Sequence, residues 1–168
     1  APEPSFVMYN MIARFTGMSY QGVDLSSDFE LDMGLFLPAI KQHQPAVIFL
    51  ALPNNPTGNL FKLENVKQII QAAEGLVVVD EAYIAFTDSD LLPMLEEYSN
   101  VVVMRTVSKV GLAGLRLGML MGEPAWLNEF DKIRLPYNIN VLTQASAEFA
   151  LTHYDGLLEQ TKLIRSER

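Results

Sequence analysis

The chain has 168 residues, a formal net charge of −8 and no cysteine. This length is enough for one domain with a substantial core, and the absence of thiols excludes disulfides and thiolate metal sites. The negative charge argues against a general affinity for nucleic acid or for an anionic membrane, so we expect neither as a partner.

The first predicted elements are a helix over Ser5–Phe15, which Gly17 would end, and a strand over Met18–Leu25. Three apolar runs without polar alternation follow, as is typical of strands buried on both faces of a parallel sheet. These runs are Ala46–Leu52, Leu76–Val79 and Val101–Met104. The longest of them is too short to cross a bilayer.

Helical patterns separate the three buried strands. One apolar stripe at helical spacing runs over residues 63–73, and a shorter helix is predicted over Leu91–Tyr98. Beyond the third strand we expect the strand Leu117–Met121 and the helices Pro124–Arg134, Val141–His153 and Leu157–Arg165. The alternation of strands and helices predicts a three-layer α/β/α fold with a mostly parallel central sheet, as a single domain over residues 1–168.

Each of the three buried strands runs into a polar cluster. The clusters are Pro53–Gly58, Asp80–Tyr83 and Arg105–Lys109. Ligands of open parallel sheets bind outside the carboxyl ends of the strands, so neighbouring strands would bring the three clusters to one place. The two histidines, His43 and His153, are interpreted as surface or packing residues, and we expect no metal site.

Lys109 lies in the small-residue sequence Ser-Lys-Val-Gly-Leu-Ala-Gly after the third strand. A lysine in such a place can form a Schiff base with an aldehyde cofactor. The alternative is an ordinary exposed lysine. Gly111, Gly114 and Arg116 favour the first reading, because backbone N–H groups and a guanidinium can bind a phosphate.

Asp80, Tyr83 and Asn55 each have a structural and a functional reading. Asp80 could be a helix cap, or the counter-ion that keeps a pyridinium nitrogen protonated. Tyr83 could pack in the core, or offer its hydroxyl to a ring oxygen nearby. Asn55 lies between two prolines that fix a turn, and a fixed turn would aim its amide at such an oxygen.

These motifs resemble those of the fold-type-I pyridoxal-phosphate enzymes, the aminotransferase superfamily, over essentially the whole chain. The resemblance implies that Asn55 and Tyr83 contact the phenolic oxygen of the cofactor and that Asp80 pairs with its ring nitrogen. It implies that Lys109 forms the Schiff base. The cofactor phosphate would be bound by Thr106, Ser108 and Arg116.

Within this superfamily the chain resembles the histidinol-phosphate aminotransferase family, through residues 4–9, 108–118 and 135–140. The resemblance implies conversion of histidinol phosphate and 2-oxoglutarate into imidazole-acetol phosphate and glutamate, by a cytoplasmic homodimer in histidine biosynthesis. Six residues separate Lys109 from Arg116, where many relatives have seven.

By the same resemblance we expect this chain to be the pyridoxal-phosphate-binding large domain of a longer protein. The family's N-terminal segment, with its phosphate-binding turn and ring-stacking aromatic residue, and its C-terminal small domain would then lie outside the chain. We expect the chain alone to be inactive for that reason. A pyridoxal-phosphate lyase or decarboxylase acting on a phosphorylated amino acid, and a non-catalytic aminotransferase-like effector domain, remain alternative functions.

Overall fold

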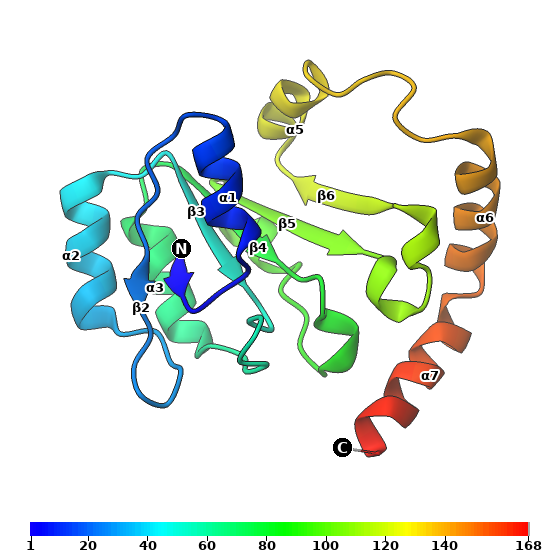
Figure 1. The fold of residues 1–168 in the computed structure, drawn as a ribbon, viewed down its shortest axis with the longest axis horizontal. Coiled ribbons are helices and arrows are strands. Elements are labelled where there is room, and N and C mark those ends of the chain that lie inside the picture. Colours follow the sequence, from blue (N-terminus) through cyan, green and yellow to red (C-terminus); the bar gives the residue numbers. More distant parts are fainter. Residues whose placement is uncertain (168) are drawn as a thin grey trace.

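The structure is a computed structural model and describes residues 1–167. Its main sheet has four strands in the order β3-β4-β5-β6, in which β3, β4 and β5 are parallel and β6 is antiparallel to β5 (Figure 1). The strands are β3 Val47–Ala51, β4 Leu76–Asp80, β5 Val101–Thr106 and β6 Gly118–Gly122. The mostly parallel sheet expected from the three apolar runs is therefore confirmed.

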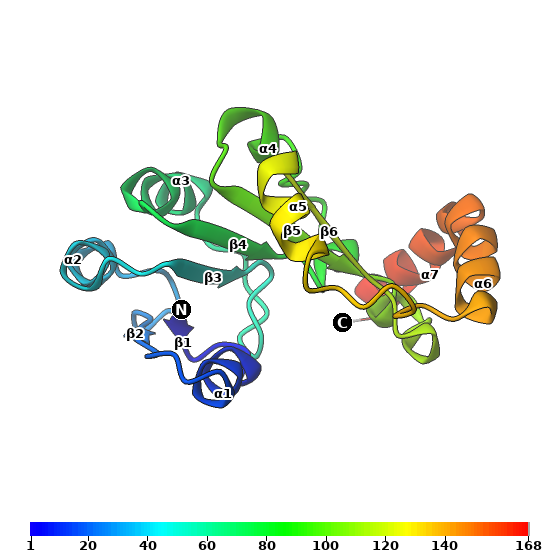
Figure 2. The ribbon, with the colours of Figure 1, turned by 90° about the horizontal axis from the view of Figure 1, so that it is seen from above.

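Helices cover both faces of the sheet. Figure 2 shows α1 and α3 on opposite sides of it. The helices that pack on the side of α3 are α2 Met33–His43, α3 Leu63–Ala72 and α4 Met94–Glu97. The other side is contacted by α1 Met8–Phe15 and α5 Pro124–Asp131. The three-layer α/β/α arrangement is thus present.

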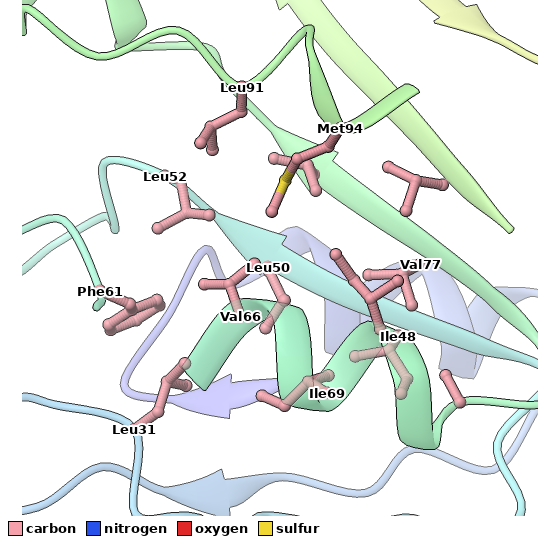
Figure 3. Packing of buried hydrophobic residues seen from close by; sticks show 14 of the residues in the cluster. Leu31, Ile48, Leu50, Leu52, Phe61, Val66, Ile69, Val77, Leu91 and Met94 are labelled. Carbon is pink, nitrogen blue, oxygen red and sulfur yellow. The ribbon is translucent and has the colours of Figure 1, made fainter. Parts of the chain in front are cut away.

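The main core lies between the sheet and the α3 side. Ile48, Leu50 and Val77 point from the strands toward Val66 and Ile69 of α3 (Figure 3). All five are buried. A smaller cluster on the opposite face is formed by the residues that alternate with these, among them Leu76, Val78 and Val102. Burial on both faces explains why these strands carry no polar alternation.

The register of the strands aligns their carboxyl ends. Ala51 at the end of β3 lies opposite Asp80, and Asp80 lies opposite Met104 of β5. The polar clusters that follow β3 and β4 therefore begin at the same level on neighbouring strands. Because successive side chains of a strand point to opposite faces, Asp80 lies on the face of Val78 and the next residue, Glu81, on the other.

The predicted strand Met18–Leu25 is wrong for most of its length. Only Val23–Asp24 forms a strand, followed by an isolated bridge between Leu25 and Leu31; this strand, β2, forms a two-stranded parallel sheet with β1, Pro2–Glu3, apart from the main sheet. The pairing partner comes from the start of the chain. Strand pairing depends on such distant partners, which a local apolar pattern does not reveal.

Helix α2 was not predicted. Pro38 lies inside it, and a proline usually interrupts a helix. The sequence nevertheless contains two helix signals. The side chain of Asp32 caps the helix by accepting a hydrogen bond from the Gly34 amide at 2.9 Å, and Phe36 and Ile40, one turn apart, are buried in the main core.

The remaining helices differ from expectation at their ends. Helix α1 begins at Met8 rather than Ser5, and α4 is confined to four residues. The last two helices are α6 Val141–Thr152 and α7 Tyr154–Ser166, which lie away from the main sheet in Figure 1. None of the helices over residues 1–167 has the length and apolar character needed to cross a membrane.

Candidate active site

A pocket lies at the carboxyl end of β3 and β4 and brings four of the predicted site residues together. Its lining consists of Phe6, Tyr9, Ala51, Pro53, Asn55, Asp80, Ala82, Tyr83 and Lys109. A carboxylate, an amide, a phenol and an amine therefore face one cavity, at the place where parallel α/β sheets bind ligands. Residues of the first, second and third polar clusters all contribute.

Asp80 is held on two sides by hydrogen bonds. Its Oδ1 accepts from the Ala82 amide at 3.0 Å, and its Oδ2 accepts from the Tyr9 hydroxyl at 2.7 Å. Burial raises the pKa of the Tyr9 phenol, and the charge of Asp80 raises it further. Tyr9 therefore stays protonated and donates its hydrogen bond to Asp80, which fixes the orientation of the carboxylate.

Lys109 follows β5 in a short 3₁₀ turn, Ser108–Val110. Its Nζ lies 5.0 Å from the centroid of the Tyr83 ring, at a distance typical of a cation–π contact. The next residue but one, Gly111, has a φ of 99°, a left-handed conformation that favours glycine. The ammonium makes no ion pair with any described residue, so it is available to a ligand in the pocket.

Thr106, Ser108 and Arg116 do not line this pocket. The Thr106 hydroxyl donates to the Leu117 carbonyl at 2.9 Å, which joins the two arms of the loop, and its oxygen lies at hydrogen-bond distance, 2.9 Å, from Ser108 Oγ. Arg116 is exposed, and the only hydrogen bond of its guanidinium within residues 1–167 is a long one, 3.4 Å, to the Ala113 carbonyl. Its guanidinium lacks an acidic partner in the described part of the chain, as a group that binds an external anion would.

Arg105, the first residue of the third cluster, points away from the pocket. Its Nε donates to the buried carboxylate of Glu81 at 2.6 Å, and its Nη2 donates to Asp90 at 2.7 Å. The other oxygen of Glu81 accepts from the Leu91 amide. Burial raises the pKa of Glu81, while Arg105 acts in the opposite sense. This network ties the segment after Tyr83 to β5, so it supports one wall of the pocket from behind.

Phe6 and Tyr9 are pocket residues that sequence reasoning missed, since it assigned no site residue before Asn55. The Tyr9 ring stacks on Phe49 of β3, with centroids 4.6 Å apart, and meets Phe6 edge-on at 5.6 Å. The signal that could have found them is their spacing: two aromatic residues three positions apart fall on one side of a helix start.

Chemistry rather than size distinguishes this pocket. Its volume is about 90 Å³, whereas a cavity of about 200 Å³ lies between residues 60–66 and 89–91. The larger cavity is lined by apolar side chains apart from Ser89 and Asp90. Among residues 1–167, no three His, Cys, Asp or Glu side chains are grouped as a metal site would require, and His43 and His153 are both exposed.

The sheet, with an amine, a carboxylate and an amide at its carboxyl edge, has the architecture of the pyridoxal-phosphate-dependent aminotransferases. A sequence model of the family "Aminotransferase class I and II" matches residues 1–167, and the chain belongs to this family. Among its relatives, histidinol-phosphate aminotransferase 2 of Nitrosococcus oceani is 59% identical over the whole chain, and histidinol-phosphate aminotransferase 2 of Cupriavidus pinatubonensis is 53% identical. The expected resemblance to histidinol-phosphate aminotransferases is confirmed.

Comparison of structures gives the same result. The crystal structure of histidinol-phosphate aminotransferase from Sinorhizobium meliloti in complex with pyridoxal-5'-phosphate superposes with a TM-score of 0.84 at 32% identity, over 96% of this chain and 46% of that one. Each of the two sequence relatives is covered over 47% of its length. The chain thus spans about half the length of the relatives it matches.

Proposed function

We propose that this chain is the cofactor-binding large domain of a pyridoxal-phosphate-dependent histidinol-phosphate aminotransferase. The observation that carries the proposal is the meeting of Lys109, Asp80 and Asn55 in one pocket of a chain that belongs to the aminotransferase family. The full-length enzyme would transfer the amino group of histidinol phosphate to 2-oxoglutarate, giving imidazole-acetol phosphate and glutamate. By the resemblance it would act as a cytoplasmic homodimer.

The side chains of the pocket fit pyridoxal phosphate. When bound, this cofactor supplies an aldehyde that condenses with amines and a ring that withdraws electrons. Lys109 would hold the aldehyde carbon covalently, and Asp80 would keep the ring nitrogen protonated. Asn55 and Tyr83 would donate hydrogen bonds to the phenolic oxygen. Phe6, which lines the same pocket, would offer an aromatic face for the ring, so this role would fall to a residue of this chain and not, as the resemblance implied, to one outside it.

The loop beyond Lys109 would anchor the phosphate group. The net charge of −8 gives the protein no general attraction for an anion, so the contacts must be local. Ser108 and Thr106 have hydroxyls, and Arg116 has a guanidinium that is not engaged with an acidic side chain among the described residues. With the phosphate fixed and the amine of Lys109 freed by an incoming substrate, that amine would move a proton between substrate Cα and cofactor C4′.

The proposal is tested by assaying the full-length protein with pyridoxal phosphate, histidinol phosphate and 2-oxoglutarate. Glutamate and the phosphorylated ketone should form in equal amounts, without release of carbon dioxide. Release of carbon dioxide from a phosphorylated amino acid, with no glutamate formed, would instead identify a decarboxylase. Binding of the cofactor with no turnover of any amine would favour an effector domain, and either result would overturn the proposal.

Tyr9→Phe is expected to lower kcat about tenfold, because the variant keeps the ring stack on Phe49 and loses only the hydrogen bond to Asp80. A hydrogen bond to a charged group contributes about 1.5–3 kcal/mol, which corresponds to tenfold or more in rate. Steady-state kinetics of the full-length enzyme would measure the change. Tyr98→Phe is the matched control, since its hydroxyl bonds Gln71 away from the pocket; an equal loss in both variants would contradict the prediction.

A further inference from the structure

Asn54 has a side chain that is almost completely buried, although it lies in a turn. Its exposed fraction is 2%, and Asn54 is one of the few polar residues in the core of the described part of the chain. Its Oδ1 accepts a hydrogen bond from Ser5 Oγ at 2.9 Å. Its Nδ2 donates to the Pro4 carbonyl at 3.0 Å and to Thr57 Oγ1 at 2.8 Å. The amide is therefore bonded at both ends, to two different segments of the chain.

These bonds join two segments that lie about fifty residues apart in the sequence and form two walls of the pocket. Pro4 and Ser5 directly precede Phe6, and Asn54 directly precedes Asn55; Phe6 and Asn55 both line the cavity. Neither segment belongs to the main sheet. Among the described residues, no backbone–backbone hydrogen bond connects residues 4–6 to residues 53–58. The Asn54 side chain is thus the polar link between the two walls.

We propose that Asn54 is a positioning residue that sets the spacing between Phe6 and Asn55, and thereby the affinity and orientation of the cofactor ring. This inference rests on the proposed function. Removal of the amide donors leaves the Pro4 carbonyl without its partner, and buried unpaired groups are costly. The N-terminal segment would then leave its place against the turn, and the aromatic wall of the pocket would become mobile.

Asn100 provides a matched control. It is also an asparagine whose Nδ2 donates to several partners, the carbonyls of Ile70, Ala73 and Gly75, at 3.1, 3.2 and 3.4 Å. It lies just before β5, at the amino end of the sheet and away from the pocket. Substitution of either asparagine should therefore lower the stability of the fold, whereas only substitution of Asn54 should weaken binding of the cofactor.

The experiment compares Asn54→Asp, Ser5→Ala and Asn100→Asp in the full-length protein. Aspartate preserves the shape of asparagine and removes both amide donors. Asn54→Asp should weaken binding of pyridoxal phosphate about tenfold in a titration of the Kd, as expected for loss of a buried hydrogen bond. It should also reduce the circular dichroism of the bound cofactor. Ser5→Ala should weaken cofactor binding less, and Asn100→Asp should lower the Tm and leave the Kd for the cofactor unchanged.

Hydrogen exchange of the cofactor-free protein gives a second readout. The amides of Tyr9 and Met11, which bond to the carbonyls of Phe6 and Val7, should exchange faster in Asn54→Asp than in Asn100→Asp. Should Asn54→Asp not fold, Ser5→Ala tests the same link. The role of Asn54 would be overturned if Asn54→Asp and Ser5→Ala both left the Kd and the exchange rates unchanged. It would also be overturned if Asn100→Asp weakened cofactor binding as much as Asn54→Asp. A wild-type protein that fails to bind the cofactor would overturn the proposed function itself.

Discussion

Lys109→Ala in the full-length enzyme is expected to abolish the covalent attachment of pyridoxal phosphate and to lower transamination at least about a thousandfold. The lysine would provide both the attachment point and the amine that transfers a proton, and proton transfer by a positioned group typically contributes 10²–10⁴-fold. Borohydride reduction followed by peptide mass mapping measures the attachment. In the wild type the mass of the cofactor should appear on the peptide that contains Lys109.

The control for this variant is Lys132→Ala. Lys132 is exposed and, among residues 1–167, forms an ion pair only with Glu129 one helical turn away; exposed ion pairs contribute little. Its removal should leave attachment and rate unchanged. Cofactor mass on a different lysine, or a Lys109→Ala variant that keeps the yellow colour of the attached cofactor, would refute the assignment of Lys109.

Asp80→Asn is expected to lower kcat roughly a hundredfold while the protein remains folded. The substitution keeps the shape of the side chain and its acceptor oxygen, but it removes the charge that would balance a protonated ring nitrogen. Loss of one partner of a desolvated ion pair costs about 3 kcal/mol or more, which corresponds to about two orders of magnitude in rate. Steady-state kinetics at saturating cofactor would separate this effect from weakened binding.

Asp131→Asn makes the same change of charge outside the pocket. Asp131 pairs with Arg134 at the surface, with 62% of its side chain exposed. It should therefore retain nearly full activity. If Asp80→Asn were as active as Asp131→Asn, the carboxylate at position 80 would have no part in the chemistry.

The sequence predicts the central part of the fold well because its signal is local. The runs around Leu50, Val78 and Val102 are apolar throughout, since both faces of each strand are covered, and this pattern identifies buried parallel strands without knowledge of their neighbours. Once these strands are identified, the polar residues that come directly after them can be placed at the carboxyl ends of the strands. Asn55, Asp80, Tyr83 and Lys109 could be expected to converge from the order of strands alone.

The rest depends on contacts between distant segments. Phe6 and Tyr9 reach the pocket from the start of the chain; Tyr9 contacts Asp80 across 71 positions of sequence. The short strand at Val23–Asp24 likewise needs Pro2–Glu3 as its partner. In α2 a local rule misled, because the buried stripe of Phe36 and Ile40 outweighs the unfavourable Pro38. Tertiary packing commonly overrides propensity in this way.

The alternation of side chains along β4 has a consequence for insertions and deletions. Asp80 and Glu81 are neighbours in sequence, yet Asp80 turns to the pocket and Glu81 turns to Arg105 on the opposite face. Shortening the valine run by one residue would shift the pairing so that each carboxylate pointed to the other's side of the sheet. The length of this strand is therefore under tighter constraint than the identity of its valines, which other branched aliphatic residues could replace.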